Sequence, residues 1–297
     1  SDVGLEWGIG GIQNLGTLAM TNCIVSDNIG EGPGGISNSG TLTMTNCIVS
    51  GNDSVDSVAG MSNGGTLTMT NCIVTENSAT DEGGIYNSGK LEMTNTTISH
   101  NNGEAAGGIY NRGDLTMTAS TVSDNEWQNI VNYRDGELTI INSTVSGNPF
   151  AGSINNFANL TMTHCTIARS GSGEEAAHLV SSGGAVTLAH SLVEGACSGD
   201  ITSGGYNIES PGNTCGFDQT GDQSDVSSKQ LNLGPLADNG GATMTHKPGD
   251  GDFGDGSVAI DPIPGADCAL DTDQRGERRP AGPDPKRCDV GAVEVQP

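Results

Sequence analysis

The stretch GGISNSGTLTMTNCIVS, residues 34–50, decides the fold because near copies of it recur along the chain. Each copy has a Gly-Gly-Ile-x-Asn segment, then a threonine-rich run, then Cys-Ile-Val or Thr-Ile. The spacings between successive copies of the Asn are 24, 25, 24, 24, 21 and 24 residues, and it stands at positions 14, 38, 63, 87, 111, 132 and 156. A fixed period of this length indicates a solenoid built from stacked repeats.

Each copy carries the signature of β-strands. Leu42 and Met44 point to one side of a strand, while the threonines between and around them point to the other, which is a period of two. The second apolar position recurs as Met20, Met44, Met69, Met93, Met117, Ile140, Met162 and Leu188, so eight coils are visible. Glycine pairs and asparagines interrupt the strands at fixed places. We therefore predict an all-β chain folded as a right-handed, single-stranded parallel β-helix of about 24 residues per coil.

The repeat also predicts the interior and the extent of the solenoid. Leu18, Leu42, Leu67 and Leu91 should line up inside one shaft. The recurrent Asn should occupy a corner, with its amide bonded to the backbone or to the next Asn along the axis. The period dissolves near residue 190. We therefore expect β-helix repeats over 1–195, and irregular final coils with a C-terminal cap or assembly region over 196–297.

Charge restricts the partners. The 36 acidic residues outnumber the 11 basic residues and give a formal net charge of −25. Nucleic acid and anionic membrane surfaces both attract Lys and Arg, so we expect neither as a partner. No apolar run approaches the roughly 20 residues of a membrane helix, and we expect no membrane insertion. Eight cysteines and a start at Ser1 fit a mature, secreted chain, outside the cell or on its surface.

Four motifs after residue 230 carry a resemblance to a known family. They are Leu233-Gly234-Pro235-Leu236 followed by Asp238-Asn239-Gly240-Gly241, Ala259-Ile260-Asp261, Asp273-Gln274-Arg275-Gly276, and Cys288-Asp289-Val290-Gly291-Ala292. In this order they resemble bacterial surface proteins with a choice-of-anchor C-terminal module, and the repeats resemble those of polymorphic outer membrane proteins. The resemblance implies a secreted bacterial surface protein without known enzymatic residues. In that family a sorting or anchoring segment commonly follows, whereas this sequence ends at Pro297, so anchoring is not implied for this form.

The eight cysteines fall into two groups. Cys197 and Cys215 flank a glycine-rich loop, and Cys268 and Cys288 flank an arginine-containing tail, so we predict two local disulfides that stiffen a loop-rich region. Cys23, Cys47 and Cys72 share one repeat position, which Thr96, Ser120, Ser143 and Cys165 continue. We interpret this column as a stack of small buried side chains. A metal or redox ladder is the alternative, although zinc needs four converging ligands and a straight column offers one face.

An enzymatic function finds little support in the residues. A polysaccharide lyase of this fold needs a basic residue as catalytic base, but no Lys or Arg precedes Lys90, and the coils carry only Lys90, Arg112, Arg134 and Arg169, at unequal repeat positions. A glycoside hydrolase needs two carboxyl groups facing one groove, whereas the acids lie mostly in variable turns. We assign no catalytic residue and expect no enzyme.

Two surface features could bind ligands. Asp250, Asp252 and Asp255 lie among glycines and offer the oxygen ligands that Ca²⁺ prefers, so calcium is the one cofactor that we consider, against a merely flexible acidic loop. Tyr86 and Tyr110 hold the same outward position on neighbouring coils. They could stack against sugars or simply pack against each other.

The two ends of the chain differ in charge. Residues 1–89 hold no Lys or Arg, while Arg275, Arg278, Arg279 and Arg287 cluster near the other terminus. We therefore expect head-to-tail association into filaments, with Glu6 and Trp7 at one contact surface and these arginines at the other. The main prediction is thus a non-enzymatic extracellular structural protein that forms a homo-oligomer. Its alternatives are a monomeric adhesin or glycan-binding stalk that holds a glycan or cell surface, and a polysaccharide lyase or hydrolase.

Overall fold

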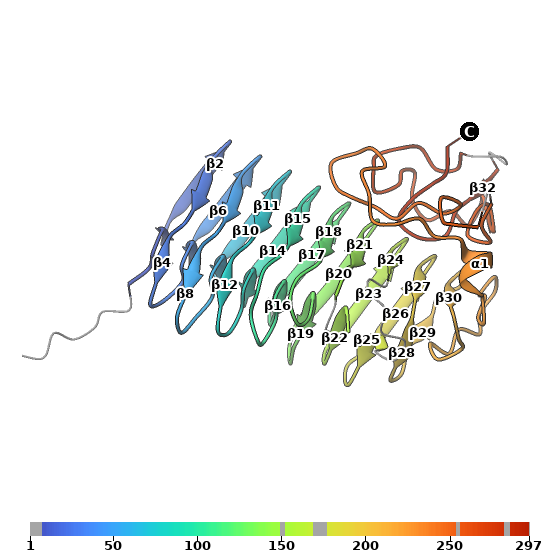
Figure 1. Cartoon of the computed structure of the whole chain (residues 1–297), viewed down its shortest axis with the longest axis horizontal. Helices are drawn as coiled ribbons and strands as arrows, with labels where there is room; N and C mark the ends of the chain where they lie inside the picture. The colour runs from blue at the N-terminus through green and yellow to red at the C-terminus, as the bar shows by residue number, and fades with distance from the viewer. Residues whose placement is uncertain (1–7, 149–151, 169–176, 254–255, 282–285, 297) are drawn as a thin grey trace, which may run out of the picture.

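A computed structural model describes residues 8–148, 152–168, 177–253, 256–281 and 286–296. Within these residues the chain winds into a solenoid with three parallel sheets of nine strands each. The predicted fold class, an all-β right-handed parallel β-helix of about 24 residues per coil, is confirmed. The rungs stack along one axis from β2 and β4 at one end to β29 and β30 at the other (Figure 1).

The sheets are named in the order in which the chain visits them. The first sheet contains β1 (Ile12–Asn14), β5 (Ile36–Asn38), β9 (Met61–Asn63), β13 (Ile85–Asn87), β16 (Ile109–Asn111), β19 (Ile130–Asn132), β22 (Ile154–Asn156), β25 (Ala177–Ser181) and β28 (Ala196–Ser198). The second sheet contains β2 (Thr17–Thr21), β6 (Thr41–Thr45), β10 (Thr66–Thr70), β14 (Lys90–Thr94), β17 (Asp114–Thr118), β20 (Glu137–Ile141), β23 (Asn159–Thr163), β26 (Val186–Ala189) and β29 (Thr202–Ser203).

The third sheet matters most for the surfaces described below. It contains β3 (Ile24–Ser26), β7 (Ile48–Ser50), β11 (Ile73–Thr75), β15 (Thr97–Ser99), β18 (Thr121–Ser123), β21 (Thr144–Ser146), β24 (Thr166–Ile167), β27 (Leu192–Glu194) and β30 (Ile208–Ser210). A short fourth sheet joins β4 (Ile29–Gly30), β8 (Asp53–Ser54) and β12 (Ser78–Ala79) in the first rungs.

Like side chains stack in register inside the shaft. Leu18, Leu42, Leu67 and Leu91 pair in successive strands, and the last three are fully buried. This is the alignment that the repeat predicts. The interior is narrow, so its columns consist of Leu, Met, Ile and Val, whose close packing and removal from water stabilise the rod.

The corners are held by asparagines, as predicted. Asn38 donates from Nδ2 to Oδ1 of Asn63 at 2.7 Å, and Asn63 donates to Asn87 at the same distance. A second ladder runs through Asn52, Asn77 and Asn101 after the third sheet. Both ladders are buried, so each amide satisfies the polar groups of its neighbours where water has no access.

The C-terminal module, the described part of residues 211–296, folds back onto the rod. It contains the short helix α1 (Ser228–Leu231) and an antiparallel pair, β31 (Ile263–Pro264) with β32 (Arg287–Cys288). Figure 1 shows it along one flank of the later rungs. The predicted division at residue 195 stays a prediction, and the three sheets extend past it to Ser210. No described helix is long and apolar enough to cross a membrane.

Candidate functional site

Along the rod, the outer face of the third sheet changes from exposed isoleucines to buried threonines. Its first outward column pairs in register from Ile24 through Ile48 and Ile73 to Thr97, and then to Thr121 and beyond. Ile24 is 68% exposed and Ile73 is 41% exposed, whereas Thr121 is buried. The difference arises because the C-terminal module covers the later rungs and leaves the earlier ones open.

The module is fastened to this face by hydrogen bonds from the threonines of the column. Thr121 donates from Oγ1 to the carbonyl of Met244 at 2.6 Å, and the amide of Ala292 donates to Oγ1 of Thr166 at 3.0 Å. Between them, Thr144 donates to Oε1 of Gln274 at 2.7 Å. Isoleucine cannot make such bonds. The column changes to threonine at Thr97, which lines the open groove, and the bonded positions begin one rung later at Thr121.

The side chain of Gln274 makes several of the hydrogen bonds that hold the module on the rod. Its Nε2 lies 2.9 Å from Oγ1 of Thr121, 2.8 Å from Oγ1 of Thr243 and 3.2 Å from the carbonyl of Ser120. The side chain is buried, so these bonds are made out of reach of water. Gln274 therefore ties two rungs of the rod to the module loop that contains Thr243.

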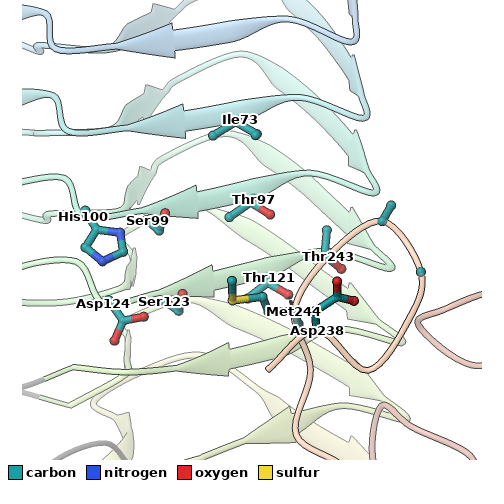
Figure 2. Close-up of a pocket in the computed structure, with 12 residues that line it drawn as sticks. Ile73, Thr97, Ser99, His100, Thr121, Ser123, Asp124, Asp238, Thr243 and Met244 are labelled. Carbon is teal, nitrogen blue, oxygen red and sulfur yellow. Dashed lines mark hydrogen bonds between the residues drawn. The ribbon is translucent and has the colours of Figure 1, made fainter. Parts of the chain in front are cut away.

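A groove lies where the module stops. A cavity of about 360 Å³ opens between β11, β15 and β18 on one side and the loop of residues 238–244 on the other. Figure 2 shows Met244 and Thr243 reaching toward Thr121, with Ile73 and Thr97 on the rungs beyond. The groove continues onto the open isoleucine column, so the two form one apolar surface, here called the third-sheet groove (Ile24, Ile48, Ile73 and Met244).

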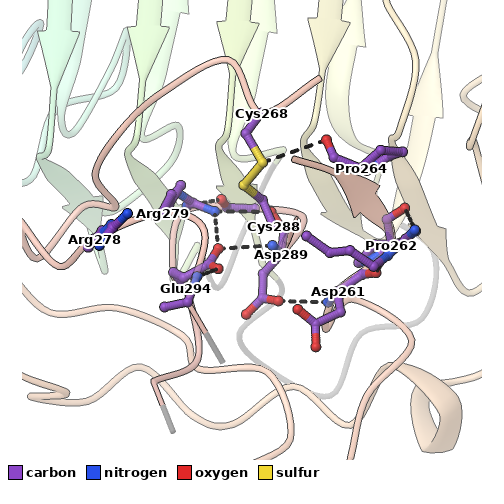
Figure 3. Close-up of a disulfide and its surroundings, with 12 residues drawn as sticks. Asp261, Pro262, Pro264, Cys268, Arg278, Arg279, Cys288, Asp289 and Glu294 are labelled. Atoms are coloured by element: carbon purple, nitrogen blue, oxygen red, sulfur yellow. Dashed lines mark hydrogen bonds and ion pairs between the residues drawn. A yellow bond between two sulfur atoms is a disulfide. The ribbon is translucent and has the colours of Figure 1, made fainter. Parts of the chain in front are cut away.

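Behind the groove, the module carries a buried ion pair. Nη1 of Arg279 lies 3.1 Å from Oε2 of Glu294, and both side chains are fully buried. Burial raises the pKa of Asp289 to about 7, with the neighbouring Glu294 adding to the shift. Figure 3 shows these groups beside the Cys268–Cys288 disulfide. Arg279 also donates to the carbonyls of Asp289 and Gly291, which indicates a structural core of the module.

Aromatic rings form a ladder on the first-sheet side. Tyr86 and Tyr110 are stacked at 6.0 Å with planes 15° apart, and Tyr133 lies 5.8 Å beyond. The ring centroid of Phe157 lies 5.5 Å from that of Tyr133, and the two ring planes are 73° apart. The edge of one ring therefore faces the other in a T-shaped contact. Of the two sequence interpretations of Tyr86 and Tyr110, mutual packing is therefore what these rings do.

Beside Phe157 lies a polar pocket. Its cavity of about 360 Å³ is lined by Arg134, Asp135, Gly136, Glu137, Phe157, Ala158, Asn159 and Gly184. Arg134 is anchored over the ring of Tyr133, with Cζ 5.3 Å from the centroid. Asn159 donates from Nδ2 to Oε1 of Glu137 at 2.6 Å and accepts from the amide of Ala185 at 3.0 Å. Exposed polar groups, of which Glu137 and Asn159 bond to each other, therefore lie beside an aromatic ring.

The cysteine predictions can be placed directly. Disulfides join Cys197 to Cys215 and Cys268 to Cys288, as predicted, with Cα–Cα distances of 4.8 and 6.0 Å. Cys47, Cys72 and Cys165 are buried free thiols, and Cys23 is half-buried. The hydroxyl of Thr96 accepts a hydrogen bond from the amide of Cys72, which fits the interpretation of a column of small interchangeable side chains.

The calcium prediction stays open. Asp250 is 3.3 Å from Nζ of Lys247, Asp252 is exposed, and Asp255 lies outside the described residues. Among the residues with a described structure, no cluster of three His, Cys, Asp or Glu side chains is arranged to hold a metal ion.

The predicted self-association residues have different environments. Arg275 pairs with Asp273 at 2.7 Å and is nearly buried, and Arg279 is buried in its pair with Glu294, so these two charges are balanced inside the module. Arg278 is exposed, and Arg287 is half-buried and donates to the carbonyls of Asp261 and Pro262. Glu6 and Trp7 lie outside the described residues.

Sequence reasoning missed the residues that build both surfaces. Gln274 was noted only within a motif. Its hydrogen bonds join positions more than 100 residues apart in the sequence, which no local pattern reveals. Tyr133 and Phe157 each follow a repeat Asn directly, at 132 and 156. Alignment of the coils on that Asn could have shown an aromatic at the same corner in two successive rungs.

Comparison with known proteins is consistent with this geometry. The stacked rungs, the asparagine ladders and the apolar columns define a β-solenoid of the single-stranded parallel type. The family model for the right-handed β-helix region matches residues 61–215, more than half of the 297-residue chain. The chain belongs to the right-handed β-helix family. No curated protein and no solved structure matches it. The resemblance of the C-terminal motifs to an anchor module stays a prediction.

Proposed function

We propose that this chain is a non-enzymatic extracellular structural protein that associates with further copies of itself. In the contact, the C-terminal module of one molecule lies on the third-sheet groove of the next. This contact joins two different surfaces and does not close, so it propagates into a filament.

The single observation that carries the proposal is the uncovered apolar column. Ile24 and Ile73 are exposed on the same face that the chain's own module covers from Thr121 onward. The outer face of the second sheet carries exposed threonines such as Thr41 and Thr43, whereas this column of the third sheet is apolar, and an exposed apolar patch is typical of a contact surface. The groove against Met244 extends the covered face without a break, so a second module could continue the cover that the first one begins.

The basic residues are distributed unevenly along the chain. The chain before Lys90 holds acids and no Lys or Arg, whereas seven of the 11 basic residues lie at or after Lys229. The exposed Arg278 belongs to that basic set. Residues 211–296 nevertheless hold 15 Asp and Glu against these seven cations, so net charge favours no orientation and the proposed contact rests on the apolar column.

Localisation outside the cell rests on the two disulfides. Bridges of this kind persist in oxidising compartments and are rare in the cytosol. The non-enzymatic assignment rests on exposure: where carboxylates and a guanidinium share a pocket in the described structure, as Asp135, Glu137 and Arg134 do, all three are open to solvent and not enclosed around a reacting group.

The test replaces the three isoleucines by the residue that later rungs use. The variant Ile24→Thr/Ile48→Thr/Ile73→Thr keeps a β-branched residue at each site, and Thr97, Thr121, Thr144 and Thr166 occupy the same column natively. Folding should therefore persist while apolar contact area is lost. We expect the native protein to form concentration-dependent oligomers in sedimentation velocity, and the triple variant to associate at least tenfold more weakly.

A matched control is Val55→Thr. Val55 is 56% exposed and lies off the third sheet, so its replacement should leave association unchanged. A native protein that sediments as a single short rod at millimolar concentration would contradict the filament and favour the monomeric adhesin. Equal association of the native protein and the triple variant would remove the third-sheet groove as the contact.

A further inference from the structure

Phe157 is the one ring of the ladder that turns out of the stack. The tyrosines before it lie face to face or tilted, so each covers a face of its neighbour. Phe157 meets Tyr133 at 73°, a T-shaped contact that involves the edge of one ring and leaves a face of Phe157 uncovered by the ladder. The ring is 40% exposed, which is a large fraction for an aromatic residue in a folded chain.

The floor next to this ring is made of backbone. A Cβ added at Gly136 would come within 2.3 Å of Oδ1 of Asn132, and one added at Gly184 within 2.1 Å of the carbonyl oxygen of Ala158. These positions must therefore stay without side chains, because the backbone there packs directly against the coil, and both glycines line the pocket beside Phe157. Asp135, Glu137, Asn159 and Arg134 surround that space with both acceptors and donors.

We propose that this pocket, here called the Phe157 pocket, binds one hexose unit of a neutral glycan. A pyranose ring has an apolar face of C–H groups, which the electron-rich face of Phe157 attracts. Its hydroxyls each need a donor or an acceptor when they leave water, and the carboxylates, the carboxamide and the guanidinium around the pocket supply both. The volume of about 360 Å³ lies in the range of small-molecule sites.

The charges around the pocket favour a neutral glycan over a uronate polymer. Two carboxylates, Asp135 and Glu137, line the pocket against one guanidinium, Arg134, which lies over Tyr133. The chain as a whole carries a net charge of −25, so a polyanion would be repelled on approach. A polymer of neutral hexoses meets no such barrier.

This site is independent of the proposed self-association. Phe157 directly follows β22 of the first sheet, and Figure 1 shows that sheet on the side of the rod away from the C-terminal module. A filament built through the third-sheet groove would leave the pocket open and repeat it along the fibre. Several weak sites on one fibre would then bind a polysaccharide with higher avidity than one site.

Affinity electrophoresis of the full chain tests the proposal. Native gels should contain, in turn, a soluble α-glucan, a β-glucan, a β-mannan, a galactan and polygalacturonate. We expect retardation by at least one neutral polymer and none by polygalacturonate. Phe157→Ala should weaken the retarding interaction about tenfold, the size expected for one aromatic contact. Phe157→Trp should retain it, since the ring face is kept.

Tyr86→Ser is the control for an indirect effect of shortening the aromatic ladder. Serine fits this position, since Ser37 and Ser62 occupy the same register in earlier rungs. This variant shortens the ladder at the far end and should bind as the native chain does. Circular dichroism should show that all three variants are folded. No retardation of the native protein in any neutral gel would overturn the proposal, as would equal retardation of native protein and Phe157→Ala. Retardation by polygalacturonate alone would overturn the choice of a neutral glycan.

Discussion

At the scale of single residues, the asparagine ladders show why one repeat position is asparagine in seven successive rungs, from Asn14 to Asn156. The Nδ2 group of Asn63 donates to Oδ1 of Asn87 at 2.7 Å and to the carbonyl of Lys90 at 3.0 Å, while its own Oδ1 accepts from Asn38. A carboxamide is the shortest side chain that offers a donor and an acceptor on one plane, so it can pass the same bond from rung to rung.

Asn63→Ala should therefore cost about 3 kcal/mol of unfolding free energy. The substitution leaves the buried Oδ1 of Asn87 without its donor and removes one of the three acceptors of Asn38 Nδ2, and an orphaned buried polar group costs about 1–3 kcal/mol. Urea unfolding followed by circular dichroism measures the change. Asn46→Gly is the control, because Asn46 is exposed with φ of 53°, a conformation that glycine adopts freely, and it should shift stability by less than about 0.5 kcal/mol. Equal losses in both variants would contradict the role of the ladder.

At the scale of elements, the corner between the second and third sheets is a column in the left-handed conformation. Asn22, Asn46, Asn71, Asn95 and Asn142 occupy it with φ between 45 and 54°. In the later rungs His164 and His190 replace asparagine, with φ of 51 and 54°, and their rings stack at 4.8 Å. The replacement coincides with the module, since Gly291 donates its amide to the carbonyl of His190.

These two histidines make stability depend on pH. Burial, followed by the nearby Arg279, lowers the pKa of both rings below the ordinary value. The neighbouring His190 lowers the pKa of His164 further, while Asp267 opposes the shift at His190. The unfolded chain then binds more protons than the folded chain below about pH 6.5, so stability is lost as the pH falls. Asp289 has the opposite effect on stability. Its pKa is raised to about 7, so its contribution to the free energy of unfolding declines as the pH rises from about 4 to 7.

The variant His164→Asn/His190→Asn separates the two effects. We expect a smaller loss of the urea midpoint between pH 7 and pH 5 than in the native chain, since the acids remain and the buried imidazoles are gone. The carboxamide at position 164 can also donate to Oδ1 of Asn142, to which no residue of the described structure donates. His100→Asn, at an exposed corner with φ of 57°, serves as the control. A pH dependence unchanged from native in the double variant would contradict this origin.

Elements also differ in how far the sequence predicts them. The rungs could be predicted because each strand pairs with its own near copy. The spacing of the repeats alone therefore predicts which residues stack above Leu42 and Asn38. The module could not, since its apolar runs are short and it is held by single contacts such as Thr121 to Met244, 123 residues apart. For the same reason the disulfides, which close short loops, were predictable, whereas the buried pair of Arg279 with Glu294 was mistaken for a surface charge.

At the scale of the whole molecule, the docked module decides which part of the third sheet is free. Its contacts with the rod are a set of scattered hydrogen bonds, of which Thr121 to Met244 and Asn142 to Thr272 are examples, and one apolar cluster around Leu192, Leu231 and Ile263. Such an interface is stabilised at a few points, so its loss should be local: the early rungs share no contact with it and have their own buried columns.

Gln274→Ala should therefore release the front of the module and leave the rod intact. The change removes the acceptor of the Thr144 hydroxyl and the donor to the hydroxyls of Thr121 and Thr243, at a cost of about 3 kcal/mol to docking. Hydrogen exchange should accelerate at Ala237 and Thr245, whose amides bond to each other's carbonyls in the loop that Gln274 holds, and stay unchanged in β6 and β10. Gln219→Ala, on the exposed surface, is the control. If exchange accelerated equally in β6, the rod and the module would unfold as one unit. The open column of Ile24, Ile48 and Ile73 would then be part of a single cooperative surface rather than a free half of a docking face.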